Sequence, residues 1–304
     1  KNYCTPVDVD KLQRAFDELE AAIKPEMDWL YETRCDRCDG RAMTNYVVWS
    51  YVFECPRCLN KFPIFDCPKS QVPKKSSEGT KTANICPYCK EEGHIEEISS
   101  RTAKRFDLIP VLVNYSCLDG CSPNEFERNH KDTNAKKQIY FERYDLEKIK
   151  EIKEKNIPYW YPTAKFPKNF SKWNTDLKSL GITRVDQIYS KRNLWALSLI
   201  RHYALENNKY KDWLLFTMTG TLLALSRMQR YSANSTFPNM ILPNTFYIAP
   251  LHKEYNAFDW YFGKKRGVIR GVKELSSIDS FALISTNSAT NLQIKNNYID
   301  FIFT

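Results

Sequence analysis

Two C-x-x-C pairs constrain this chain most strongly, because four thiolates at a suitable spacing can hold one metal ion. Cys35-Asp-Arg-Cys38 and Cys55-Pro-Arg-Cys58 are separated by sixteen residues, which is the spacing of a zinc ribbon. The segment 46–53 between them is rich in β-branched and aromatic residues, so it predicts a strand that returns to the second pair. We therefore predict that these four cysteines form a first zinc site. A redox dithiol would instead need a C-x-x-C pair that opens a helix in a βαβ unit, and that pattern is missing.

A third pair, Cys86-Pro-Tyr-Cys89, indicates a second metal site. Its expected partners are Cys117 and Cys121, which follow the strand-like segment 108–115. These four sulfurs predict a second zinc ribbon, with a wider spacing in its last pair.

Four further residues leave alternatives open around this second site. His94 and His130 are alternative ligands, although a lone histidine in a polar loop is usually solvated. Cys4 and Cys67 remain unassigned, and we interpret both as unliganded thiols, with Cys67 as the nearer substitute ligand.

Charge and cysteine usage limit the classes of protein that fit. Lysine and arginine number 45 and aspartate and glutamate 36 in the 304 residues, which gives a formal charge of +9. This excess fits a nucleic acid or an acidic partner. No segment approaches twenty continuous apolar residues and no signal-peptide pattern opens the chain, so we expect no membrane contact. Cysteines in C-x-x-C pairs favour metal in a reducing compartment, and the expected location is the cytoplasm.

Hydrophobic periodicity predicts an α+β fold in four parts. A leading helix over 8–24 and a link fill residues 1–31, and a tandem zinc-ribbon region fills 32–144. A mainly helical region follows over 145–245, and a strand–helix–strand region closes the chain over 246–304. The predicted later elements are helices over 145–156, 185–189, 193–207, 213–231 and 254–275, and strands over 246–249, 281–284 and 298–303. Because the chain stops directly after an apolar strand pattern, we expect it to be a segment of a longer protein whose sheet the last strands complete.

A row of basic residues on the predicted helix 254–275 is the candidate nucleic-acid surface. The helix carries five cations with no acid between them, and two arginines precede it in sequence: Lys264, Lys265, Arg266, Arg270, Lys273, Arg227 and Arg230. We predict that this face contacts DNA phosphates. A solvated basic face is the competing interpretation.

The order of several segments resembles a known family. The matching segments are KNYCTPVD (1–8), WLYETRCDRC (29–38), YWYP (159–162), SKRNLWAL (190–197), TFYIAP (245–250), EYN (254–256) and IDFIFT (299–304). In this order they resemble the middle of zinc-containing DNA methyltransferases of the amino-methylating kind, which modify adenine N6 or cytosine N4. The resemblance covers nearly the whole chain.

The resemblance implies a target-recognition insertion between two motifs of such an enzyme. A glycine-rich S-adenosylmethionine loop would precede the segment, and a catalytic Asp-Pro-Pro-Tyr or Asp-Pro-Pro-Phe would follow it. This sequence contains neither motif, so we assign no catalytic and no cofactor-binding residues and expect the segment to be inactive alone. The implied partners are duplex DNA and the flanking methyltransferase core, in a restriction–modification setting.

Two other classes compete with this interpretation. A non-catalytic zinc-ribbon module that binds protein or RNA would also lack catalytic motifs. A zinc hydrolase fits less well, because catalytic zinc keeps an open coordination position whereas four thiolates close it.

Overall fold

The computed structural model describes residues 7–74, 78–100, 102–121, 124–167, 174–232, 241 and 246–275. Within them, an antiparallel sheet and a layer of helices confirm the α+β class. The elements are α1 (Val9–Tyr31), β1 (Glu32–Arg34), β2 (Arg41–Glu54), β3 (Lys61–Pro63), β4 (Lys69–Pro73), β5 (Thr80–Asn84), α2 (Pro87–Glu91), β6 (Lys104–Cys117), β7 (Glu125–Asn129), α3 (Ala135–Tyr140), a π-helical turn (Phe141–Leu146), α4 (Glu147–Glu154), α5 (Asn174–Ser179), a 3₁₀ turn (Val185–Ile188), α6 (Lys191–Glu206), α7 (Lys211–Thr219), β8 (Leu251–Tyr255) and α8 (Ala257–Leu275).

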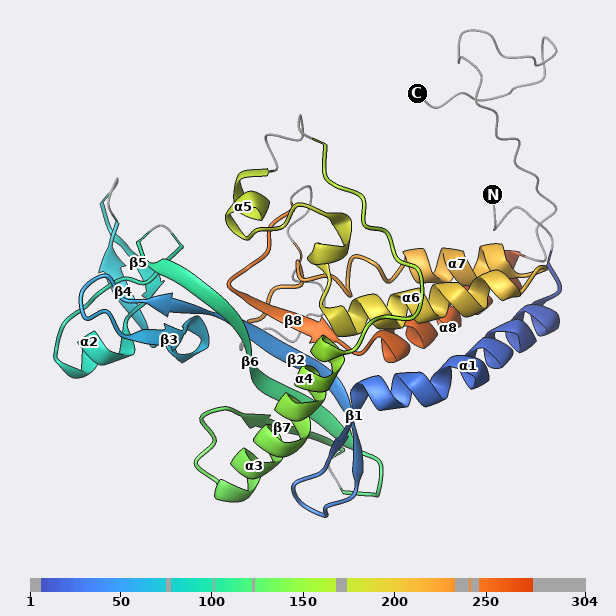
Figure 1. Ribbon diagram of the computed structural model, residues 1–304, viewed down its shortest axis with the longest axis horizontal. Coiled ribbons are helices and arrows are strands. Elements are labelled where there is room, and N and C mark those ends of the chain that lie inside the picture. Colours follow the sequence, from blue (N-terminus) through green and yellow to red (C-terminus); the bar gives the residue numbers. More distant parts are fainter. Residues whose placement is uncertain are drawn as a thin grey trace, which may run out of the picture.

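The long strands β2 and β6 form the spine of the molecule (Figure 1). Each has 14 residues, so at about 3.3 Å per residue each spans roughly 45 Å. They pair antiparallel from Ala42 opposite Cys117 to Glu54 opposite Lys104. β1, β3 and β8 also pair with β2, β7 pairs with β6, and β4 and β5 form a separate hairpin.

The middle of β2 is buried on both faces. Val47 and Trp49 point to one side, where they pack with Phe141 and Ile149 of the helix that runs from α3 through α4. Val48 points to the other side and joins a second cluster of apolar side chains. Two covered faces explain why residues 46–53 are almost continuously apolar or aromatic.

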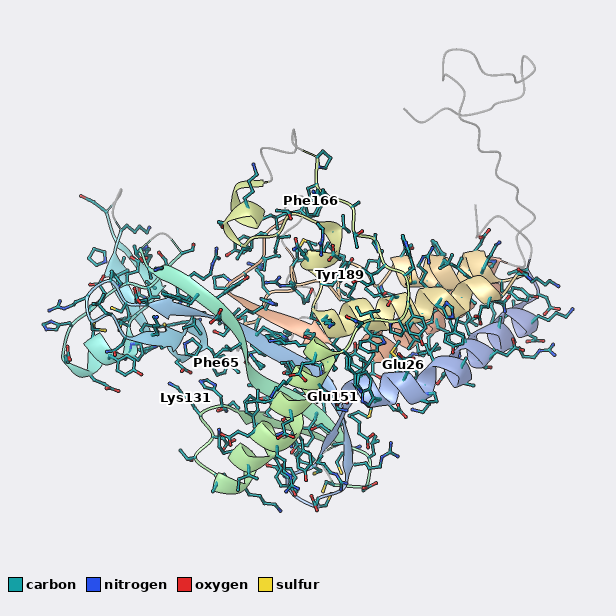
Figure 2. All side chains as sticks on the ribbon, viewed as in Figure 1. Glu26, Phe65, Lys131, Glu151, Phe166 and Tyr189 are labelled. Atoms are coloured by element: carbon teal, nitrogen blue, oxygen red, sulfur yellow. The ribbon has the colours of Figure 1, made fainter. Side chains whose placement is uncertain are left out.

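The helices α1, α6 and α8 pack together beside the sheet and hold the largest apolar core. The predicted leading helix exists, but α1 continues through Pro25 to Tyr31. Next to this proline, the Glu26 carboxylate accepts hydrogen bonds from Trp195 Nε1 and Tyr159 Oη, both at 2.6 Å (Figure 2). These contacts and the buried positions beyond Pro25 show why tertiary packing overrides a local helix-stop signal.

Three predicted elements are wrong in their bounds. The helix predicted over 254–275 begins only at Ala257, because Glu254 and Tyr255 belong to β8. The helix predicted over 213–231 ends at Thr219, and turns follow it. Hydroxyl groups of Thr217, Thr219 and Thr221 donate to nearby backbone carbonyls there, a local pairing that competes with helix continuation. The strand predicted over 246–249 lies instead at β8, which pairs with the middle of β2.

The strands predicted over 281–284 and 298–303 fall outside the described residues. Of the helices in the described ranges, none combines the length and the hydrophobicity that crossing a bilayer demands.

Candidate metal centres and basic surfaces

All eight cysteines predicted as metal ligands lie in two groups of four. In each group the sulfurs lie within 4.8 Å of one another. The first group is Cys35, Cys38, Cys117 and Cys121, and the second is Cys55, Cys58, Cys86 and Cys89. The ligand set is therefore brought together as predicted, whereas its division into two sites is different.

The predicted pairing of Cys35 and Cys38 with Cys55 and Cys58 is wrong. The residues between these two pairs do not turn back but form one continuous strand, β2, so the pairs lie at its opposite ends. Because β6 runs antiparallel to β2, Cys117 arrives opposite Ala42, beside the first pair. Cys86 and Cys89 precede β6 in the chain, so they lie at the other end of the spine, next to Cys55 and Cys58. Each centre thus joins one pair of cysteines next to an end of β2 with one pair from the end of β6 or the chain next to it.

The first centre has the dimensions of a tetrahedral thiolate site. Cys35 Sγ lies 3.8 Å from Cys121 Sγ, and Cys38 Sγ lies 3.5 Å from Cys117 Sγ. Four sulfurs at metal bonds of about 2.3 Å would be separated by about 3.8 Å in a regular tetrahedron. The thiols are not joined as disulfides.

The second centre has the same dimensions and is more deeply enclosed. Cys55 Sγ lies 3.7 Å from Cys89 Sγ, and Cys58 Sγ lies 3.7 Å from Cys86 Sγ. Three of the four side chains are buried, and only Cys58 is partly accessible. The two sets of four thiols are equally suited to one tetrahedral, thiophilic ion each.

The first two C-x-x-C turns are built alike. In one, Asp39 N donates to Cys35 O at 2.9 Å, and in the other Leu59 N donates to Cys55 O at 3.0 Å. The residue after each pair has a left-handed backbone, with φ of 61° at Asp39 and 59° at Leu59. This turn aims both sulfurs of a pair to the same side, so the local geometry predicted from the spacing is confirmed.

Backbone amides favour the thiolate form in each centre. The backbone N–H of Cys121 lowers the pKa of Cys117 to about 7. Burial opposes ionisation of Cys58, but the backbone N–H of Asn60 and the neighbouring thiols lower its pKa to about 7. Burial raises the pKa of Cys86 to about 11. A bound cation would ionise the remaining thiols, so metal binding releases protons.

The alternative ligands do not join either centre. His130 Nε2 lies 3.1 Å from an Asp66 oxygen, which Lys131 also contacts (Figure 2), and its Nδ1 lies 3.2 Å from Val111 O. Within the described parts of the chain, His94 and Cys67 also lie outside both four-sulfur groups. Burial raises the pKa of Cys67 to about 12. Cys4 lies outside the described residues.

A buried ionic network beside the first centre was not predicted. Arg128 of β7 has a fully buried side chain, and its Nε donates to Asp145 Oδ2 at 2.6 Å. It also donates to Thr33 Oγ1 and Arg34 O of β1, both at 2.5 Å. The guanidinium lies 4.2 Å from the Tyr115 ring centroid. One arginine therefore ties β1, β6, β7 and the π-helical turn together next to the cysteines.

The five predicted cations of α8 do not form one DNA-facing surface. Lys265 points to α1, where its amino group lies 2.7 Å from Asp17 and 3.5 Å from Glu20, and its side chain is only 12% exposed. Arg266, Arg270 and Lys273 are exposed and follow one side of the helix at i, i+4 and i+7. Lys264 is also exposed, but beside Gly220 at the end of α7.

Arg227 and Arg230 are half-buried rather than displayed with α8. Arg227 donates to Tyr51 Oη at 2.7 Å and to Gln187 O at 3.1 Å. Arg230 forms an isolated β-bridge with His252. Their positions beside the sheet separate them from the exposed α8 cations.

A cationic and aromatic cluster near the second centre was missed. Lys61 and Lys104 lie over the ring of Phe106, at 4.1 and 4.9 Å from its centroid. Arg105 lies over the ring of Tyr51 at 4.8 Å. The consecutive residues Lys104-Arg105-Phe106 carry a basic–aromatic signal, but the pairing of β3 and β6 with β2 is needed to bring Lys61 to them.

Comparisons with known proteins give no relative. No family model, no curated protein and no solved structure matches this chain.

Proposed function

We propose that this chain is a zinc-stabilised DNA-binding segment, the target-recognition insertion of an S-adenosylmethionine-dependent DNA methyltransferase that methylates an amino group. The observation that carries the proposal is the pair of four-cysteine centres, one at each end of the β2–β6 spine. Closed four-thiolate sites serve structure rather than catalysis, so the segment supplies a rigid support for binding.

Zinc is the ion that best fits both centres. Tetrahedral four-sulfur sites suit zinc or iron, and zinc needs no redox partner. Purified protein is expected to contain two zinc ions per chain that resist mild chelation. A measured content of one zinc ion per chain would show that one of the two centres does not bind zinc.

DNA is favoured by the net charge of +9 and by exposed cations on three elements, α8, β3 and β6. Arg266 and Arg270 project from α8, while Lys61 and Lys104 flank Phe106 near the second centre. Such residues would meet phosphates, whose neutralisation releases counterions and makes affinity fall with salt. The second candidate class is a module for RNA or protein, and the same cations would also meet RNA phosphates.

Charge reversal tests the α8 surface. Arg266→Glu/Arg270→Glu is expected to weaken binding to duplexes of any sequence and to reduce the salt slope by about 2, one for each lost phosphate contact. The matched control is Lys11→Glu/Arg14→Glu on α1, which changes the net charge equally. Equal affinity of both double variants at low salt would exclude α8 from the DNA surface. Absence of duplex binding by the unmodified protein would reject the DNA proposal itself.

The methyltransferase part rests on the order of the resembling segments and has its own test. Sequencing the gene on both sides of this segment is expected to reveal a glycine-rich loop upstream and Asp-Pro-Pro-Tyr or Asp-Pro-Pro-Phe downstream. A gene that encodes neither motif would leave a zinc-stabilised binding protein without methyltransferase chemistry.

A further inference from the structure

A cavity of about 200 Å³ opens between the middle of the sheet and the helices α4 and α6. Its walls come from β2, β6, β8, the end of α4 and the start of α6. An apolar cavity of about 150 Å³ is enough to hold benzene, so this one can take a larger ring system. It lies between the two cysteine centres and shares no residue with them.

One part of the cavity wall is apolar and partly aromatic. The residues that form it are Trp49, Leu108, Ile149, Ile152, Tyr189 and Leu225. Tyr189 lies just before α6 (Figure 2). A wall of this kind favours a flat, uncharged ring.

The polar part of the wall is positively charged. Lys153 Nζ lies 5.6 Å from the Trp49 ring centroid, and Arg227 lines the cavity from another segment. Lys191 also lines it, and its amino group donates to Lys153 O at 2.7 Å. Glu254 is the only acid among the lining residues, and its two oxygens already accept from Trp49 Nε1 and Arg192 Nε. The cavity therefore favours an anion.

Two buried guanidinium groups at the cavity retain unused donors. Arg192 is 6% exposed and its Nη2 has no hydrogen-bond partner among the described residues. Arg227 Nε is likewise buried there without a partner. Buried donors without partners are uncommon in folded proteins. The cations that line the cavity, Lys153, Lys191 and Arg227, suit a phosphate group, since guanidinium and ammonium groups are the common protein partners of phosphate.

We propose that this cavity binds a single nucleotide unit, with the base against the apolar wall and the phosphate against Lys153 and Arg227. Stacking on an aromatic wall tolerates any base. The cationic part of the wall makes binding depend on the phosphate. The unit could come from a DNA strand, as an unpaired nucleotide, or from a free mononucleotide. The proposal rests on the proposed function only where DNA is the source.

Calorimetric titration of the full chain tests the shared chemistry. Deoxyadenosine monophosphate is expected to bind at least ten times more tightly than deoxyadenosine or inorganic phosphate. Equal or absent binding of all three probes would overturn the proposal for a free nucleotide. The same chain is then titrated with a duplex that carries one unpaired 2-aminopurine and with the fully paired duplex. Preference for the unpaired nucleotide identifies DNA as the source.

Two variants with one matched control locate the site. Lys153→Glu is expected to weaken nucleotide binding at least tenfold. Lys150→Glu, on the same helix with a side chain 76% exposed and outside the cavity wall, is expected to leave it unchanged. Leu108→Trp fills the cavity and is expected to abolish binding while both zinc ions are retained. Equal effects of the two lysine variants would exclude this cavity as the site.

The outcomes separate this proposal from the proposed function. Nucleotide binding without duplex binding would reject the DNA proposal and keep the cavity as a nucleotide site. Duplex binding that is indifferent to an unpaired nucleotide, without mononucleotide binding, would reject the cavity proposal alone.

Discussion

Exchanging two cysteines at a time reveals which thiols share an ion. In the structure Cys38 and Cys117 belong to one centre, whereas Cys58 belongs to the other. Cys38→Ser/Cys117→Ser therefore removes two ligands from one centre and none from its counterpart. Cys38→Ser/Cys58→Ser removes one ligand from each. We expect one zinc ion that resists chelation in the first double variant and none in the second.

The free energies involved make this difference large. A structural zinc site binds its ion with about 10–16 kcal/mol, which equals or exceeds the roughly 5–15 kcal/mol that stabilise a typical domain. Loss of half the ligands should thus unfold one end of the spine. Because the two ends lie roughly 45 Å apart along β2 at about 3.3 Å per residue, the far end should keep its ion.

Metal content after dialysis against a chelator gives the stoichiometry, and hydrogen exchange gives the location. In Cys38→Ser/Cys117→Ser, amides of β7 should lose protection while those of the β4–β5 hairpin keep it. If Cys38→Ser/Cys58→Ser instead keeps one resistant ion and Cys38→Ser/Cys117→Ser keeps none, then the cysteines pair in sequence order. The antiparallel β2–β6 spine would then be refuted.

Three further changes have predictable effects on stability. Arg128→Met should lower the free energy of unfolding, measured by urea denaturation, by about 3–5 kcal/mol, because it leaves Asp145 buried without its cation. Adding Asp145→Leu should restore most of the lost stability. A loss below about 1 kcal/mol in Arg128→Met alone would contradict the importance of this ion pair. Leu59→Gly should raise the free energy of unfolding by about 1 kcal/mol, because Leu59 has a left-handed backbone with a φ of 59° and a side chain that is 66% exposed. A lower melting temperature of this variant would show that the leucine side chain makes a stabilising contact. Burial lowers the pKa of His252 to about 3, so below pH 6.5 the unfolded chain takes up the proton first and stability should fall by up to about 1.4 kcal/mol per pH unit. The free energy of unfolding of His252→Met should fall less steeply with decreasing pH, by up to about 1.4 kcal/mol per pH unit. If the stability of the variant and of the unmodified protein changed in parallel down to pH 4, the imidazole of His252 would not be buried in its neutral form.

The local structure of the centres was predictable from sequence, whereas their partnership was not. A C-x-x-C pair specifies a tight turn through its own backbone hydrogen bonds, and both expected turns are present at Cys35 and Cys55. The sixteen residues between the pairs allow either a hairpin or one long strand. Residues 46–53 are apolar enough for both, and only the second long strand, β6, decides for the continuous one.

Sequence also fails to predict which cations of α8 are exposed. The run Lys264-Lys265-Arg266 looks uniform in sequence, but successive helical residues are turned by about 100°. Lys265 therefore points to the buried side and meets Asp17, which is 248 positions away in the chain. Only the packing of α8 on α1 distinguishes the paired cation from its exposed neighbours.

The two centres also explain how an irregular spine keeps its register. Three register shifts interrupt the β2–β6 pairing, and one of them lies at Trp49, opposite Pro110, which has no backbone N–H to donate. Pairing weakened in this way is prone to slip, and a slip by one residue would turn Trp49 to the other face of the sheet. A metal ion held by the four cysteines at each end would forbid that slip, because Cys117 must stay opposite Ala42 for its sulfur to reach the first pair. Metal ions bound at the two ends of the spine would thus fix the side chains that line the cavity at its middle.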